Sequence, residues 1–266
     1  MVEAIAPAAS DRFLEIGPGP GVLTTRLAAR AAHVTAIEID RDLASDLGQT
    51  MPANVEVVTG DILETDLAPY LSGGPVRVAG NLPYNISSPI LFTLLRLAGS
   101  GGPVPHTETV KRGQSPFLAN KGDSPGLLDA TLMLQREVAD RLVATPGTRD
   151  YGVLTIFTAV QADVHRLLTL PPGAFRPAPK VHSAVIRLSF VAPRVPAELA
   201  PTFERMVRVM FTQRRKTLAN ALKPFAETAG RPPTEALASA AIDPGARPET
   251  LGLAALTRLA AAFRPA

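Results

Sequence analysis

The stretch Phe13-Leu14-Glu15-Ile16-Gly17-Pro18-Gly19-Pro20-Gly21 decides the fold class of this 266-residue chain. Its first four residues are typical of a short apolar strand, the next five form a glycine-rich turn, and residues 22–32 follow with helical periodicity. A strand, a glycine-rich turn and a helix in this order open a nucleotide-binding βαβ unit, because glycines let the backbone approach a ligand closely. We therefore predict an α/β protein that binds a ligand at this turn.

The glycine spacing argues against a pyrophosphate cradle. The dinucleotide fingerprint G-x-G-x-x-G requires glycine at position 22, where this chain has valine. No histidine and no Tyr–Lys pair suited to relaying a proton stands at the predicted strand ends. A nicotinamide-dependent dehydrogenase is therefore the least favoured reading.

Acidic residues stand at the ends of the second and third predicted strands, residues 33–39 and 54–58. Glu38 lies 21 residues beyond Gly17, a distance at which a carboxylate commonly accepts hydrogen bonds from ribose hydroxyls. Asp61 follows the third strand and is placed to accept a hydrogen bond from the amine of an adenine. Each residue alone is more often a structural cap, but an ordered series at one sheet edge indicates a ligand site.

A fourth apolar run, residues 76–80, ends in Asn81-Leu82-Pro83-Tyr84. The Asn81 oxygen and a carbonyl of the Leu82-Pro83 unit can accept both N–H groups of a nucleobase amine, and Pro83 restricts the backbone that aims that carbonyl. Tyr84 offers a face for base stacking, which is worth roughly 1–3 kcal/mol per base. The plain alternative is a strand end with a proline turn and a half-buried tyrosine.

An aromatic residue stands in a second proline-rich segment, Phe175-Arg176-Pro177-Ala178-Pro179-Lys180, between predicted strands 164–170 and 181–190. Its prolines cannot serve a central strand, so we expect a stiff loop. Phe175 either points outward, to sandwich a flipped base with Tyr84, or fills the core, and the spacing favours neither.

The remaining segments give a coarse map of helices and strands. We expect Ser87 to cap a helix over residues 89–97, a strand over 128–135, and helices over 136–144 and from about residue 151. Residues 99–126 contain 6 Gly, 4 Pro and 3 Ser in 28 positions, which predicts a flexible insertion. An inert role is favoured over a substrate-facing flap.

The C-terminal part of the chain is basic. Residues 194–266 hold 11 Lys+Arg against 6 Asp+Glu, whereas residues 1–193 hold 16 against 18. A helix predicted over 203–222 has one apolar side and one basic side, which suits phosphate contacts, although a solvated basic helix is the alternative. Arg214 falls on the apolar side, so either the helix bends near Thr212 or Arg214 is buried and paired. The predicted RNA-binding residues are Arg208, Arg214, Arg215 and Lys216.

Composition excludes several classes of protein. The chain has no cysteine, which excludes disulfides, thiolate zinc sites and catalysis through a cysteine nucleophile. Its hydrophobic fraction is 46%, and it has no apolar run of about 18 residues and no signal peptide. We expect a soluble, cytoplasmic protein without membrane contact.

Seven segments in order resemble the ribosomal RNA adenine dimethyltransferases of the KsgA type. They are FLEIGPGPG, IEID, GDIL, NLPYNIS, LMLQREVADRLVA, FRPAPKVHSAV and FTQRRKT, and they recur in family order within residues 10–225. The macrolide-resistance methyltransferases share the earlier segments, and QRRKT points to the KsgA type.

The resemblance implies a seven-stranded, Rossmann-like class I methyltransferase domain over residues 1–192 and a helical RNA-binding domain over 193–266. It implies S-adenosylmethionine as methyl donor, no metal, and a monomer that acts on two adjacent adenines of a small-subunit rRNA hairpin in the immature subunit. The implied cofactor-binding residues are Glu15, Gly17, Gly19, Glu38, Asp61 and Asn81. The implied catalytic residues are Asn81, Leu82, Pro83, Tyr84 and Phe175.

Two features depart from the family pattern. Family members carry a basic segment resembling RFGQNFL ahead of the first helix, whereas this chain starts after it, and the insertion at 99–126 is not part of the pattern. A non-catalytic assembly factor that binds immature small subunits therefore stays an alternative. A macrolide-resistance-type enzyme and a DNA or protein N-methyltransferase are the others.

Overall fold

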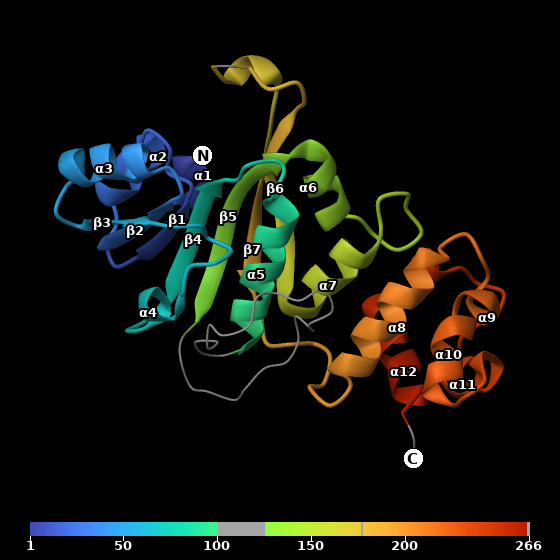
Figure 1. Ribbon diagram of the computed structural model, residues 1–266. Coiled ribbons are helices and arrows are strands. Elements are labelled where there is room, and N and C mark those ends of the chain that lie inside the picture. The colour runs from blue at the N-terminus through green and yellow to red at the C-terminus, as the bar shows by residue number, and fades with distance from the viewer. Residues whose placement is uncertain (101–125, 177, 265–266) are drawn as a thin grey trace. The chain divides into compact units, whose positions relative to one another are not determined.

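The computed structural model describes residues 1–100, 126–176 and 178–264 (Figure 1). It divides into two compact units, one made of residues 1–139 and 162–191 and the other of residues 140–161 and 192–266. Of the insertion expected at residues 99–126, residues 101–125 lie outside the described part. Gly99 and Ser100 end a helix.

The first unit is built on a seven-stranded sheet with the strand order β3-β2-β1-β4-β5-β7-β6. Its strands are β1 Arg12–Ile16, β2 His33–Glu38, β3 Val55–Thr59, β4 Val76–Asn81, β5 Leu127–Gln135, β6 Ala162–Leu170 and β7 Ser183–Phe190. The first five strands run parallel, whereas β7 is antiparallel to both of its neighbours. This sheet confirms the predicted Rossmann-like class.

Helices cover the sheet of the first unit. They are α1 Val2–Ile5, α2 Val22–Ala28, α3 Arg41–Thr50, α4 Ala68–Leu71, α5 Ser87–Ser100 and the start of α6 Arg136–Leu142, with a 3₁₀ turn η1 at Pro172–Ala174. α2 and α3 contact β2, and α5 contacts β5. Because helices shield the central strands, Leu14, Val78 and Ala130 are fully buried, which explains the near-continuous apolar runs in the sequence.

A buried arginine ties the amino ends of the central strands to the N-terminal helix. Arg77 of β4 lies 2.7 Å from Asp11 and 2.9 Å from Asp129, and it donates to the carbonyl of Ile5 at 2.8 Å. Its guanidinium also lies 5.2 Å from the centre of the Phe13 ring. These contacts satisfy a buried charge and fix the end of the sheet opposite to the carboxyl ends of the parallel strands.

The second unit is helical. Its helices are α7 Val153–Gln161, α8 Ala200–Thr212, α9 Leu218–Ala221, α10 Lys223–Ala229, α11 Pro233–Ser239 and α12 Leu253–Ala262, with a 3₁₀ turn η2 at Pro248–Thr250. The predicted apolar side of α8 is confirmed, since Phe203, Met206 and Met210 are fully buried. Apolar residues of α7 and α12 complete this core, and α7 therefore groups with the C-terminal helices.

The single helix predicted over residues 203–222 is wrong, because α8 ends at Thr212 and α9 begins at Leu218. One alternative placed a bend near Thr212, and α8 ends at that residue. The other expected Arg214 to be paired, and Arg214 contacts Glu249. The functional division at residues 192/193 stays a prediction. The compact units differ from it by assigning residues 140–161 to the second unit.

Neither a membrane-spanning helix nor a metal cluster is found in the described parts of the chain. None of the helices there is long and apolar enough to cross a bilayer. Within the same residues, no group of three or more His, Cys, Asp or Glu side chains is arranged to hold a metal ion.

Candidate active site

The carboxyl ends of the parallel strands gather the predicted site residues at one edge of the sheet. Ile16 of β1 pairs in register with Ile37 and with Gly80, and Asn81 of β4 pairs with Met133. The strand order then places the residues that follow β3, β2, β1 and β4 in succession along this edge. Asp61, Glu38, Gly17 and Asn81 belong to these four strand ends.

The glycine-rich turn forms an open cradle. Gly17 and Gly19 have φ values of +63° and +55°, which non-glycine residues adopt only with strain, and a Cβ atom at either position would meet no atom within 4 Å. The amide of Gly17 donates to the Ile37 carbonyl at 3.0 Å, and that of Gly19 donates to a carboxylate oxygen of Glu38 at 2.9 Å. The turn is thus fixed against β2 while its outer side stays open to a ligand.

The acidic residues beside this cradle retain capacity to accept hydrogen bonds. Glu38 accepts from the amides of Gly19 and Asp40, the latter at 3.0 Å. Asp61 accepts from the amide of Leu63 at 2.9 Å. A carboxylate offers about four lone-pair positions, so both side chains can accept further hydrogen bonds from a ligand.

Glu15 is buried and carries an unpaired oxygen. Its side chain is only 1% exposed, and its Oε2 has no hydrogen-bond partner among the described residues. Burial raises the pKa of Glu15 to about 7; the nearby Thr24 hydroxyl, which makes no hydrogen bond of normal geometry, opposes this shift, and the Glu38 carboxylate adds to it. An unpaired buried carboxyl beside the glycine-rich turn suits a positively charged group of a ligand.

The Asn81 segment forms a tight, anchored turn. The amide of Leu82 donates to the Met133 carbonyl at 2.9 Å, and the Pro83 carbonyl accepts from the amide of Ile86 at 3.2 Å. Gly80 must lack a side chain, because a Cβ atom there would lie 2.8 Å from the Ile16 carbonyl oxygen. Asn81 itself is exposed.

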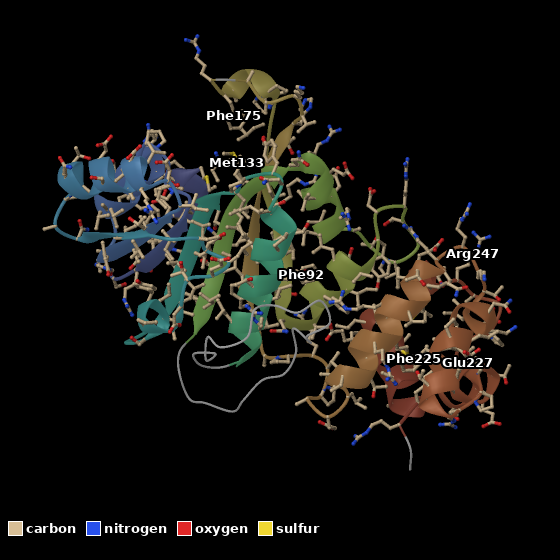
Figure 2. All side chains as sticks on the ribbon, viewed as in Figure 1. Phe92, Met133, Phe175, Phe225, Glu227 and Arg247 are labelled. Carbon is tan, nitrogen blue, oxygen red and sulfur yellow. The ribbon has the colours of Figure 1, made fainter. Side chains whose placement is uncertain are left out.

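Phe175 joins the Asn81 segment at one hollow. The hollow has a volume of about 280 Å³ and is lined by Asn81, Leu82, Pro83, Tyr84, Phe175 and Pro179. Phe175 is half-buried, so the alternative of a core plug is wrong. Figure 2 shows Phe175 near the end of the sheet that carries Met133, the strand partner of Asn81.

Tyr84 is held at two atoms. Its hydroxyl lies 2.7 Å from the hydroxyl of Ser183, and its carbonyl accepts from the hydroxyl of Ser87 at 3.3 Å. The helix expected over residues 89–97 begins two residues earlier than predicted, and Ser87 is its first residue and not a cap before it.

The four predicted RNA-binding residues divide into two pairs. Arg208 bonds Glu204 at 2.9 Å and lies 4.9 Å from the centre of the Phe157 ring. Arg214 contacts Glu249 at 3.1 Å and donates to the carbonyls of Thr148 at 2.9 Å and Arg149 at 2.7 Å. These two arginines therefore form hydrogen bonds and ion pairs within the second unit.

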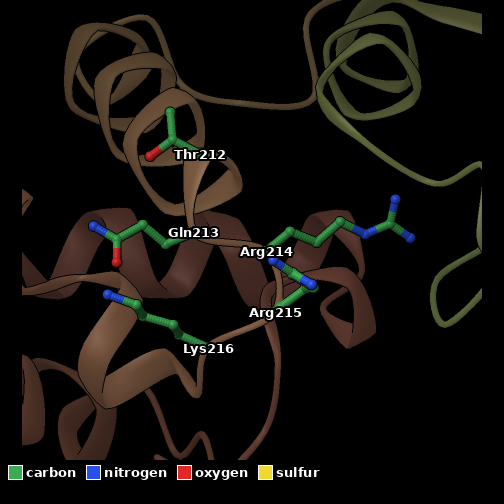
Figure 3. Close-up of a pocket in the computed structure, with 5 residues that line it drawn as sticks. All are labelled: Thr212, Gln213, Arg214, Arg215 and Lys216. Atoms are coloured by element: carbon green, nitrogen blue, oxygen red, sulfur yellow. The ribbon is translucent and has the colours of Figure 1, made fainter.

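Arg215 and Lys216 are exposed and line a hollow of about 740 Å³ with Thr212, Gln213 and Arg214. Figure 3 shows Arg214 directed away from Gln213 and Lys216, whose side chains point to the same side. The two exposed cations are the better placed of the four predicted residues to meet an anionic ligand.

Comparison with known proteins decides the family. A family model described as ribosomal RNA adenine dimethylase matches residues 1–247. The chain belongs to this family.

The dimethylase family assignment agrees with individual relatives. The chain is 45% identical to "Ribosomal RNA small subunit methyltransferase A" of Geobacter metallireducens, over 93% of this chain and 84% of that protein. It is 40% identical to the protein of the same name from Pseudomonas aeruginosa, over 98% of this chain and 87% of that protein.

Two solved structures are similar to this chain over nearly its whole length. A dimethyladenosine transferase from Plasmodium falciparum matches with a TM-score of 0.71 and 24% identity, over 97% of this chain and 91% of that chain. The 23S rRNA methyltransferase ErmE matches with a TM-score of 0.65 and 26% identity, over 98% and 94%. The first likeness supports the fold alone.

Three residues next to the candidate site were not predicted from the sequence. Ile39 follows Glu38 directly and is 66% exposed, so a large apolar side chain lies in solvent beside a predicted ligand residue. The sequence signal for Ile39 is its position directly after the acidic residue that ends the second strand. Gly80 and Ser183 gave none, because their importance rests on contacts with β1 and Tyr84 that are distant in sequence.

Proposed function

We propose that this chain transfers methyl groups from S-adenosylmethionine to the N6 amines of adjacent adenines in a small-subunit rRNA hairpin, which gives N6,N6-dimethyladenosine. One observation carries the proposal: the amine-orienting segment Asn81 to Tyr84 and the aromatic Phe175 line one hollow at the carboxyl edge of the sheet. The glycine-rich cradle belongs to the adjacent strand β1. The names of the relatives supply the substrate class.

The methyl donor fits the cradle in its chemistry. S-adenosylmethionine, when bound, supplies a methyl group already activated by a sulfonium. We assign the open backbone at Gly17 and Gly19 to its close approach, Glu38 to its ribose hydroxyls and Asp61 to its adenine amine. The unpaired Glu15 oxygen would accept a hydrogen bond from its positively charged group, and Asn81 of β4 would line the same site.

Orientation of the target amine is the task of the Asn81 segment. The Asn81 oxygen accepts one N–H of the adenine amine. The Pro83 carbonyl is already engaged by Ile86, so we assign the Leu82 carbonyl as the second acceptor. With both N–H groups held, the nitrogen lone pair points at the methyl carbon and forms the new N–C bond as the S–C bond breaks.

No side-chain base is required for this transfer. The alkylated nitrogen becomes positively charged, and it loses a proton to solvent or through the acceptor oxygens. Catalysis then rests on positioning and on electrostatic preorganisation, which together account for large rate enhancements in other enzymes. Tyr84 and Phe175 contribute to positioning by stacking against the flipped adenine.

The RNA partner is recognised in this proposal through its phosphates. Arg215 and Lys216 offer charges that project from the turn between α8 and α9. A monomer that binds the immature small subunit satisfies these requirements. The presence of all the amine-orienting residues at one hollow favours catalysis over a purely non-catalytic assembly role.

Replacing Asn81 tests the proposed function. Asn81→Ala removes an acceptor of the amine, so we expect methyl transfer to fall at least a hundredfold while donor affinity, measured by calorimetry, stays within about threefold. Asn85→Ala, an exposed asparagine four residues along, is the matched control and should retain activity. Equal loss of donor binding and of transfer in Asn81→Ala would contradict the assigned role.

A further inference from the structure

The aromatic wall of the hollow is fixed by two serines that the proposed chemistry does not use. Ser183 is fully buried, and its hydroxyl lies 2.7 Å from the Tyr84 hydroxyl. Ser87 is 2% exposed, and its hydroxyl donates to the Tyr84 carbonyl. One serine thus holds the tip of the tyrosine ring and the other holds its backbone.

The Ser183 anchor is rigid because of its place in the sheet. Ser183 begins β7, where it pairs with Gln135 of β5 on one side and with Leu170 of β6 on the other. Within the described residues, Tyr84 is the partner found for its hydroxyl. A buried hydroxyl without a partner is costly, so the contact constrains both side chains.

The contact with Ser183 restrains a side chain that lines the hollow. Tyr84 is half-buried and forms one wall of the hollow that Phe175 also lines. A tyrosine ring has two rotatable bonds, and its hydroxyl lies at the end farthest from the backbone. Fixing that end fixes the direction of the ring axis, and so where the ring lies along the hollow, which decides where a stacked base can lie.

We infer that Ser183 is a positioning residue, which keeps the Tyr84 ring at the place in the hollow where it holds the target adenine for transfer. This inference rests on the proposed function and adds a residue that touches neither the base nor the methyl donor. Because phosphate contacts dominate RNA docking, the effect of Ser183 belongs to a step after docking, when the adenine enters the hollow.

Because Ser183 acts after RNA docking, its loss should change kcat and leave KM nearly unchanged. Ser183→Ala should lower kcat about fivefold to tenfold, which is the loss expected for one hydrogen bond of this kind. The KM for RNA and the affinity for S-adenosylmethionine should stay within about twofold. A purely structural serine would instead change the melting temperature and leave kcat unaltered.

A double-mutant cycle tests the inference directly. Single-turnover transfer would be measured for the wild type, Ser183→Ala, Tyr84→Phe and the double variant, with donor affinity as the check that each protein is folded. Both single variants should lose activity to a similar extent, and the double variant should be no slower than either of them. Ser189→Ala, on the same strand, is the control and should match the wild type.

Two results would overturn the inference. One is a Ser183→Ala variant with wild-type kcat, which would show that transfer does not need the Ser183 hydroxyl. The other is a double variant whose losses multiply, which would show that the two hydroxyls act independently. A wild-type protein without transferase activity would overturn the proposed function and this inference together. The first two results leave the proposed function standing.

Discussion

At the scale of single residues, the candidate site combines a buried acid with an open backbone turn. Glu15 is a buried carboxyl with an unpaired oxygen, which is costly for the fold. Gly17 and Gly19 have positive φ values, which glycine adopts without strain and other residues resist. Glu15 therefore couples stability to pH, and the two glycines leave room for a ligand.

The first prediction concerns pH. The pKa of Glu15 rises from its ordinary value of 4.5 to about 7 in the folded protein, so between these values the folded state holds a proton that the unfolded chain releases. The contribution of Glu15 to the free energy of unfolding is therefore complete below pH 4.5 and falls by ~3 kcal/mol as the pH rises to 7. Glu15→Gln should remove this fall.

Urea unfolding at pH 5 and pH 8 measures the effect. The wild type should lose more stability between the two values than Glu15→Gln does, and Glu64→Gln, an exposed glutamate of the same unit, should behave like the wild type. An unchanged pH dependence in Glu15→Gln would show that the buried carboxyl does not titrate in this range.

The second prediction separates backbone strain from ligand binding. Gly17→Ala should cost about 1 kcal/mol of stability, because alanine resists a positive φ, and the added methyl should weaken donor binding at least tenfold by entering the cradle. Gly147→Ala is the matched control, since Gly147 has a φ of +87° and equal open space but lies in the second unit. Calorimetry should show unchanged donor affinity for the control; equal losses in both variants would contradict the cradle.

At the scale of elements, the turn between α8 and α9 combines two adjacent arginines with different tasks. Arg214 binds Glu249 of η2 and two carbonyls of the loop before α7, whereas Arg215 is exposed. Arg214 therefore holds three segments of the second unit together. Arg215 and the neighbouring Lys216 are available to a phosphate.

The two arginines should respond differently to substitution. Arg214→Ala should lower the free energy of unfolding by roughly 1 kcal/mol through lost hydrogen bonds, after allowance for the partial exposure of its ion pair. Arg215→Ala should leave the melting temperature unchanged, weaken RNA binding and reduce the slope of log K against log salt by about 1. An Arg215→Ala variant with the wild-type salt slope would remove Arg215 from the RNA interface.

Elements with strong local patterns were predictable from the sequence, and contacts between distant segments were not. The apolar runs of the sheet were located to within a few residues because both faces of the central strands are buried. The prediction of one helix over residues 203–222 is wrong because periodicity carries no information about the partners of Arg214. These partners lie about 35 and 65 residues away in the sequence. For the same reason, the sequence does not predict that Phe175 lies near Tyr84 or that Ser183 contacts Tyr84.

At the scale of the whole molecule, charge is divided between the two compact units. The unit made of residues 140–161 and 192–266 has 13 Lys+Arg and 8 Asp+Glu in its sequence, whereas the remaining residues have 14 and 16. The basic balance thus belongs to the helical unit, and the residues proposed for the donor and amine sites belong to the sheet unit. This division suits an enzyme that docks a polyanion with one part and performs transfer with another.

Nucleoside mass spectrometry on unmethylated small ribosomal subunits, incubated with this protein and S-adenosylmethionine, tests the central claim most directly. We expect N6,N6-dimethyladenosine to appear with the wild type and to be absent with Asn81→Ala. Subunits that bind the protein and the donor yet gain no dimethyladenosine would contradict the account.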